Sequence, residues 1–182
     1  MAGITLVTGG ARSGKSDHAL SLVLGPRDGT AVFVATAEAF DDEMRQRIEK
    51  HRRERPADMP TIEAPVDLAG ALRSLPAGTG IAVIDCLTVW MSNLMHHLGP
   101  DADSYRPVQE LLEFIERPPC DLVFVTNEVG LGIVPENAMA RRFRDLAGGL
   151  NRAVAARADR VIFMVCGIPV QAKPPVAGAK EK

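Results

Sequence analysis

The sequence of 182 residues lacks the features of several protein classes. Lysine and arginine number 21 against 23 acidic residues, so the formal net charge is −2 and the basic excess of nucleic-acid-binding domains is missing. The longest apolar run, around residues 81–90, contains Asp85 and is too short to span a bilayer. The N-terminus has no basic segment followed by an apolar one. We therefore expect a cytoplasmic protein with no membrane span and no nucleic-acid partner.

Cysteine is scarce as well. Cys86, Cys120 and Cys166 are the three that are present, and no two of them have the C-x-x-C spacing of metal or redox sites. Each lies in or beside an apolar run, which favours buried, reduced thiols over a metal or redox centre. The chain is long enough to close one core without disulfides, so we expect one domain.

Short apolar runs alternate with longer periodic stretches along the chain. Runs rich in Val, Ile and Phe predict buried strands at Ile4–Thr8, Ala31–Thr36, Ile81–Cys86, Leu122–Thr126 and Arg160–Val165. Helices are predicted over residues 15–24, 41–55, 66–75, 87–97, 104–117 and 136–157. This alternation predicts an α/β fold of three layers, with a parallel sheet, helices on both of its faces, and ligands at the carboxyl ends of the strands.

The end of the chain has a different composition. Residues 169–182 contain three prolines between 169 and 175 and then the letters AGAKEK, with too little apolar content to pack. We therefore predict a nucleotide-binding domain over residues 1–168 and a disordered tail over residues 169–182.

One segment matches a phosphate-binding pattern. The letters GGARSGKS fit G-x-x-x-x-G-K-[ST] and stand between the first predicted strand and the first predicted helix. Such a turn brings unpaired backbone N–H groups and a helix N-terminus to an anion. We expect Lys15 to act in catalysis on the β and γ phosphates and Ser16 to ligate Mg²⁺. The predicted nucleotide contacts of this loop are Gly9, Gly10, Ala11, Arg12, Ser13, Gly14, Lys15 and Ser16.

A second candidate site lies in the charged segment DDEMRQRIEKHRRER. Met44, Ile48 and His51 recur at i, i+4 and i+7, which puts them on one stripe of a predicted helix. His51 thus occupies a position where a core residue is expected. On spacing alone the histidine is either a half-buried packing residue or a catalyst. The basic residues around it nearly balance the acids and are typical of a solvated face.

Two acidic residues follow predicted strands. Asp85 ends the third strand and is either a ligand for Mg²⁺, direct or through water, or a cap for the helix that follows Cys86. Glu128 follows the fourth strand and contacts a ligand or metal, or caps a helix that begins near Pro135. The residues alone leave both pairs of alternatives open.

Four segments in the same order point to one family. They are GGARSGKS, then VATAEAFDDEM with the following RI-x-x-HR-x-x-RP, then VIDCLTVWMSNL, then VFVTNEVGLGIVPENAMARRFRDLAGGLNRAVAARADRV. From Ile4 to about Gly167 the chain resembles the bifunctional adenosylcobinamide kinase/adenosylcobinamide-phosphate guanylyltransferase family of cobalamin biosynthesis. The resemblance implies a RecA-like P-loop NTPase fold, Mg²⁺ as cofactor, GTP or ATP and adenosylcobinamide as substrates, and a homo-oligomer.

The resemblance also implies roles for particular residues. The family carries a histidine that becomes covalently guanylylated, and His51 stands at the matching position. Beyond the phosphate loop, the implied GTP contacts are Ala35, Thr36, Ala37, Arg52, Arg53, Glu54, Arg55, Glu63 and Asp85. The chain departs from the family at two of them, since the family commonly has Ser at the position of Ala37 and often Glu at that of Asp85.

Three rival functions are a GTP-dependent switch, a recombinase-type DNA-handling ATPase and another small-molecule kinase. The sequence lacks the Asn-Lys-x-Asp motif that reads guanine in switches and has Thr126-Asn127-Glu128-Val129 at the strand end instead. The acidic composition disfavours the DNA-handling ATPase. We therefore predict an enzyme that phosphorylates adenosylcobinamide and then transfers GMP to the product through His51.

Overall fold

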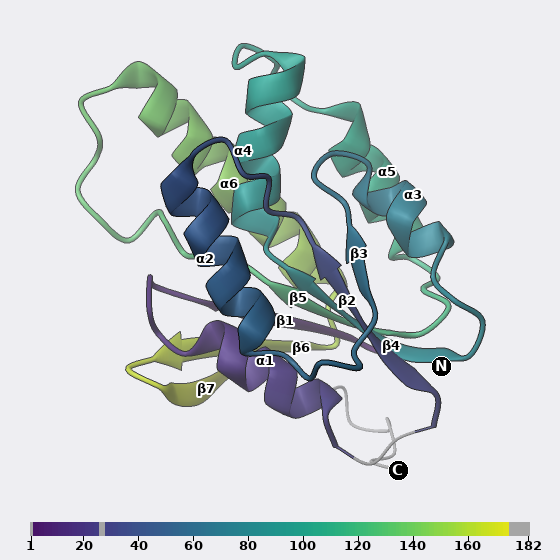
Figure 1. Ribbon diagram of the computed structural model, residues 1–182. Helices are drawn as coiled ribbons and strands as arrows, with labels where there is room; N and C mark the ends of the chain where they lie inside the picture. The colour runs from purple at the N-terminus through teal and green to yellow at the C-terminus, as the bar shows by residue number, and fades with distance from the viewer. Residues whose placement is uncertain (1, 26–27, 175–182) are drawn as a thin grey trace.

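One sheet contains the strands of the described chain, residues 2–25 and 28–174 of this computed structural model (Figure 1). The order across the sheet is β3-β2-β4-β5-β1-β6-β7, and neighbouring strands are parallel except for β6 and β7. The strands are β1 (Ile4–Gly9), β2 (Thr30–Ala35), β3 (Thr61–Glu63), β4 (Thr79–Asp85), β5 (Asp121–Val125), β6 (Arg160–Val165) and β7 (Ile168–Lys173). The five predicted strands are confirmed, and β3 and β7 are additional.

The helices lie where the sequence predicts them and differ only at their ends. They are α1 (Lys15–Val23), α2 (Asp42–Arg53), α3 (Leu68–Arg73), α4 (Leu87–Leu98), α5 (Arg106–Phe114) and α6 (Ala138–Arg157). Side-chain caps start α2, α3, α4 and α6; in α2, for example, Asp41 accepts the Met44 N–H at 2.7 Å, and in α6 Asn137 accepts the Ala140 N–H at 3.1 Å.

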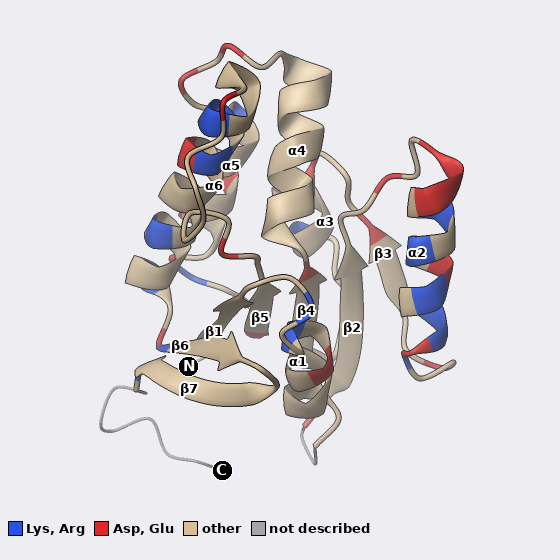
Figure 2. Cartoon of the chain, turned by 90° about the vertical axis from the view of Figure 1, so that its left-hand side faces the viewer, with Lys and Arg blue, Asp and Glu red and all other residues tan. Residues whose placement is uncertain are grey.

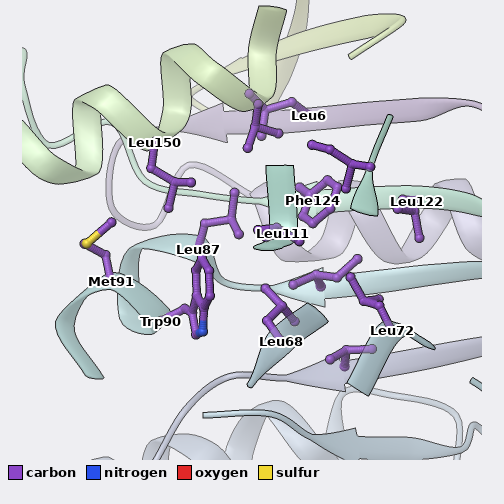
Figure 3. Close-up of a cluster of buried hydrophobic side chains, with 14 of the residues drawn as sticks. Leu6, Leu68, Leu72, Leu87, Trp90, Met91, Leu111, Leu122, Phe124 and Leu150 are labelled. Atoms are coloured by element: carbon purple, nitrogen blue, oxygen red, sulfur yellow. The ribbon is translucent and has the colours of Figure 1, made fainter. Parts of the chain in front are cut away.

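Two apolar clusters pack against the two faces of the sheet. The larger one joins α3, α4, α5 and α6 to one face and includes Trp90, Phe124 and Leu150 (Figure 3). The smaller one joins Ala19, Leu20 and Val23 of α1 to the other face. Each leucine-sized side chain buried in this way contributes about 2 kcal/mol. The predicted three-layer arrangement with helices on both faces is confirmed, with most of the helical cover on one side.

Helix α2 stands apart from both layers. Figure 2 shows it beside the sheet with charged residues along its length, and it has no buried residue. Met44 and Ile48 are half-buried, whereas the His51 side chain is 47% exposed. The predicted stripe is therefore correct for its first two members only, and His51 is not a core packing residue.

The predicted disordered tail needs correction, because its first residues form β7. This strand pairs antiparallel with β6, with Met164 opposite Pro169. Proline is tolerated there because β7 is an edge strand and needs no hydrogen bond on its outer side. Cys166 and Gly167 form the turn with φ of 52° and 83°, the left-handed backbone of two-residue hairpins. The rest of the predicted tail, from residue 175 on, lies outside the described residues.

The three cysteines differ in exposure. Cys86 and Cys120 are buried and free, as predicted, and burial together with the nearby charge of Asp85 raises the pKa of the Cys86 thiol to about 12. Cys166 is exposed in the hairpin turn, so the prediction of burial is wrong for this residue. Among the described residues, no helix has both the length and the apolar character needed to cross a membrane.

Lys173 gives β7 a testable role in stability. Its Nζ donates to the carbonyl oxygens of Ala155 and Ala156, both at 3.3 Å, and to that of Ala158, at the C-terminal end of α6. A cation at this position stabilises the helix dipole. We expect Lys173→Ala to lower the free energy of unfolding by about 1 kcal/mol in urea denaturation. The control is Gln171→Ala on the same strand, and equal losses in the two variants would contradict the assignment.

Candidate functional site

The carboxyl ends of the central strands bring distant predicted residues into one row. Ala35 at the end of β2 pairs with Glu63 of β3 on one side and with Asp85 of β4 on the other. Asp85 pairs in turn with Val125 of β5, which lies opposite Val7 of β1. Because β1 leads into the phosphate loop, this row runs directly beside the predicted nucleotide site, at the edge that Figure 2 presents to the viewer.

Two glycines give the phosphate loop its shape. Gly9 and Gly14 have φ of 149° and 86°, a range that favours glycine. A Cβ at Gly9 would lie 2.5 Å from the backbone oxygen of Met164, so a side chain does not fit there. The β6–β7 turn supports the loop from the other side, because the Gly167 N–H donates to the Ser13 carbonyl at 3.1 Å. The hairpin that the sequence did not predict therefore holds the phosphate loop.

Lys15 and Ser16 lie at the start of α1, as the loop pattern predicts. Lys15 is buried, and its Nζ donates to the Gly10 carbonyl at 2.5 Å. Ser16 Oγ donates to Asp85 Oδ2 at 2.7 Å, which joins the loop to β4. Asp85 does not cap α4, since that role falls to Cys86, whose Sγ accepts the Val89 N–H at 3.4 Å.

Burial and the neighbours of Asp85 act on its carboxyl group in opposite directions. Burial raises the pKa of the carboxyl group, and the Ser16 hydrogen bond, followed by the charges of His51, Lys15 and Arg55, acts in the opposite direction. Burial likewise lowers the pKa of Lys15, against the opposing effect of Cys86 and Asp85. His51 of the outlying helix is thus within electrostatic reach of the carboxylate beside the phosphate loop.

Arg55 fixes the C-terminal end of α2 to the sheet. Its guanidinium lies over the Phe33 ring of β2, 4.0 Å from the centroid, and its Nη1 donates to Thr61 Oγ1 at 3.2 Å. Its Nε donates to the His51 carbonyl at 3.2 Å. Burial lowers the pKa of Arg55, the charge of Arg52 adds to this, and Asp85 opposes it. The backbone of His51 is therefore tied to the sheet through Arg55.

The remaining predicted contacts differ in how open they are. Glu63 and Arg52 are exposed, Ala37 is half-buried, and Arg53 is exposed 4.0 Å from Glu49. Glu63 belongs to the row of strand ends and Ala37 follows β2, whereas Arg52 and Arg53 lie in the last turn of α2.

Thr36 is fully buried, and all its polar atoms are engaged. Its N–H donates to the Asp85 carbonyl at 3.2 Å, and its Oγ1 both donates to the Cys86 carbonyl and accepts the Cys86 N–H at 2.8 Å. Its own carbonyl accepts from Asn93 Nδ2 at 2.7 Å. Thr36 therefore holds the backbone of Asp85 and Cys86 in position, and its contact with a nucleotide stays a prediction.

Sequence reasoning missed a buried polar network beneath the site. Thr126 Oγ1 is 3.0 Å from Thr88 Oγ1 and 2.7 Å from Asn151 Oδ1, and Thr88 also accepts the Asn127 N–H at 2.7 Å. Asn151 closes the network by donating to the Asn127 carbonyl at 3.1 Å. Polar residues on the apolar faces of α4 and α6 were the available signal, because buried polar groups need partners.

Glu128 does not cap α6, and the contact with a ligand or metal stays a prediction. Its Oε1 accepts the Gly130 N–H at 2.8 Å within its own loop, and α6 is capped by Asn137 instead. Its backbone N–H donates to the Gly9 carbonyl at 3.0 Å. The alternative of a helix cap is therefore wrong, and the loop after β5 begins directly beside the phosphate loop.

The N-terminal end of α2 has its own anchor on α4. His97 Nε2 lies 2.7 Å from Glu38 Oε2, and the Phe40 ring centroid lies 4.7 Å from that of His96. Glu38 and Phe40 belong to the segment between β2 and α2. With Arg55 at the other end, α2 is held at both ends although none of its residues is buried.

Known proteins resemble this chain over nearly its full length. The model of the cobinamide kinase / cobinamide phosphate guanyltransferase family matches residues 5–172. The bifunctional adenosylcobalamin biosynthesis protein CobP of Pseudomonas aeruginosa is 44% identical, covering 92% of this chain and 96% of the relative. The bifunctional adenosylcobalamin biosynthesis protein CobU of Escherichia coli is 39% identical to this chain, and CobU of Salmonella typhimurium is 41% identical. Each match covers 92% of this chain and 98% of the relative.

Solved structures share the fold at much lower identity. The flagellar accessory protein FlaH of Methanocaldococcus jannaschii has a TM-score of 0.57 at 15% identity, over 99% of this chain and 82% of that one. An ATPase of a bacterial type III secretion system has a TM-score of 0.56 at 11% identity, over 93% of this chain and 56% of that one. These similarities support the P-loop NTPase fold alone.

The anchor between Glu38 and His97 predicts a local effect on α2. Removing one partner of an exposed pair costs about 0.5 kcal/mol, so Glu38→Ala is expected to speed amide hydrogen exchange in α2 about twofold. Exchange in α1 provides the internal reference. Glu110→Ala, which removes the exposed pair with Arg106 on α5, is the matched control. Unchanged exchange in α2 would show that the anchor does not restrain this helix.

Proposed function

The chain belongs to the cobinamide kinase / cobinamide phosphate guanyltransferase family, and on that premise we propose that one nucleotide site at the carboxyl edge of its sheet serves both reactions. The protein phosphorylates cobinamide and transfers GMP from GTP to the phosphorylated product. We assign the adenosyl form of cobinamide as the substrate, and the hydroxyl of its aminopropanol group as the acceptor of the first phosphate. This assignment disfavours the switch and the DNA-handling ATPase.

In the kinase reaction the phosphate loop holds the triphosphate. We assign the nucleotide contacts to the backbone of residues 9–16 and to Lys15. In this assignment the Lys15 ammonium group gives up its hydrogen bond to the Gly10 carbonyl and contacts the β and γ phosphates instead. Phosphoryl transfer requires mainly positioning and neutralisation of charge, so a cation beside the reacting phosphate is the main source of transition-state stabilisation. The acceptor hydroxyl displaces the nucleoside diphosphate from the γ-phosphorus.

The residues beside the loop fit a magnesium ion. Ser16 Oγ and Asp85 Oδ2 are hard oxygen ligands that already lie 2.7 Å apart. Mg²⁺ is usually held by one or two protein oxygens and takes its other ligands from substrate phosphates and water. When bound, the ion neutralises charge on the phosphates. Because burial raises the pKa of Asp85, the cations around it help keep the carboxylate ionised.

We assign His51 as the nucleophile of the guanylyl transfer. The carrying observation is geometric: Arg55 donates to the His51 carbonyl at 3.2 Å and lies over Phe33 of β2, the strand that pairs with β4 and Asp85. A neutral imidazole nitrogen attacks the α-phosphorus of GTP and pyrophosphate leaves, and the phosphate of the corrinoid then displaces the histidine. Arg52, Arg53 and Arg55 neutralise the triphosphate during this step, with Ala35, Ala37 and Glu63 as further contacts.

We propose that the enzyme is a homo-oligomer, since the loop after β5 exposes large apolar side chains. Leu131 is 78% exposed, Ile133 96% and Val134 59%, more than a free monomer surface usually shows in one loop. Sedimentation equilibrium should give a mass above that of one chain, and a monomer at working concentration would contradict the proposal. The cytoplasmic location stays a prediction.

Mass spectrometry of the intact protein tests the role of His51. After incubation with GTP and Mg²⁺ the wild type should carry one GMP, and His51→Ala should carry none while its kinase reaction persists. Labelling should also fall as pH is lowered, since a protonated imidazole has no lone pair to donate. His97→Ala is the matched control and should still be labelled. A GMP adduct on His51→Ala would contradict the proposed nucleophile.

A further inference from the structure

Within the part of the chain that the structure describes, the His51 ring has a carboxylate partner at one of its two nitrogens. Nδ1 lies 3.1 Å from Glu54 Oε2, three residues further along the chain and on the same face of the helix end. We propose that Glu54 is the positioning residue for the guanylyl transfer. Its carboxylate accepts a hydrogen bond from Nδ1–H, so that Nε2 is the nitrogen that attacks the α-phosphorus. This inference rests on the proposed function of His51 and gives Glu54 a partner other than the nucleotide.

The chemistry of a neutral imidazole makes such a partner useful. The ring carries one N–H and one lone pair, and a hydrogen bond at one nitrogen decides which nitrogen keeps the lone pair. A carboxylate accepts hydrogen bonds and does not donate when ionised, so it selects the form with the proton on Nδ1. The lone pair on Nε2 is then available without any proton having to leave.

The balance of the reaction gives Glu54 a second role. The Nε2 lone pair forms the N–P bond, and the bond from the α-phosphorus to the bridging oxygen breaks, with its electrons leaving on pyrophosphate. The ring is then positively charged, and the negative charge of Glu54 at Nδ1 offsets it. When the corrinoid phosphate attacks, the N–P electrons return to Nε2 and the original ring is restored.

Neighbouring groups hold both members of the pair. Glu54 Oε1 lies 4.0 Å from Lys50 Nζ, so the two oxygens of Glu54 face different partners. The His51 carbonyl accepts from Arg55, whose guanidinium lies over Phe33. The ring of His51 and its backbone therefore each have a separate contact, and the side chains of the pair, 47% and 40% exposed, stay open to a ligand.

Two substitutions separate the parts of this role. Glu54→Gln keeps an oxygen that accepts a hydrogen bond from Nδ1–H but removes the negative charge, whereas Glu54→Ala removes both. Orienting partners of metal-bound histidines contribute about 10- to 100-fold, and for this half-exposed pair we expect Glu54→Ala to slow guanylylation about tenfold in a single turnover. The guanylylation rate of Glu54→Gln should lie between that of Glu54→Ala and that of the wild type. Glu43→Gln in the first turn of the same helix is the matched control and should match the wild type.

The tautomer of His51 is the readout that a merely structural role would not move. In full-length protein labelled with ¹⁵N-histidine, at a pH where the ring is neutral, NMR should show the proton on Nδ1 in the wild type and in Glu54→Gln. Glu54→Ala should move it toward Nε2, and the adduct of the wild type should be bonded through Nε2. An unchanged tautomer together with an unchanged labelling rate in Glu54→Ala would overturn the inference.

Failure of this inference differs from failure of the proposed function. If the wild type takes up no GMP on His51, the proposed nucleophile is wrong, and the tautomer of the free protein still decides whether Glu54 orients the ring. If the wild type is labelled and Glu54→Ala is labelled equally fast with the same tautomer, the role of His51 stands and that of Glu54 falls.

Discussion

The hydrogen bond from Ser16 to Asp85 joins the phosphate loop to the neighbouring strand, and the site is arranged around it. Parallel strands end at one edge, so β1 delivers the loop and β4 delivers the carboxylate to the same place. Thr36 fixes the backbone of the carboxylate, and the β6–β7 turn supports the loop from the opposite side. Residues far apart in sequence thereby meet at one edge of the sheet, where we propose the nucleotide site.

Burial of charge is the cost of this arrangement. Burial works against the ionised form of Asp85 and of Lys15, and each opposes that effect in the other. Arg55 adds positive charge from the end of α2. A helix without buried residues suits this purpose, because α2 carries its charged groups to the edge of the sheet while its ends are anchored to β2 and α4.

The sequence predicted what depends on local pattern, and missed what depends on contacts between distant segments. Apolar periodicity and the glycine-rich motif identified the central strands, the helices and Lys15 with Ser16. Strand β7 was missed because its proline, Pro169, is compatible only with an edge strand, and the sequence does not reveal where the sheet ends. The exposure of His51 was missed because helical spacing says nothing about whether a helix packs on the sheet. The pairing of Thr126 with Asn151 likewise exists only in the fold.

The central claim is that His51 lies beside the nucleotide held by the phosphate loop. Mn²⁺ bound with a GTP analogue that cannot be cleaved broadens NMR signals of nearby protons, so it measures this proximity directly. The account predicts strong broadening of the His51 ring signals and much weaker broadening for His96, which lies at the far end of α4. His51 signals as sharp with Mn²⁺ as with Mg²⁺ would contradict it.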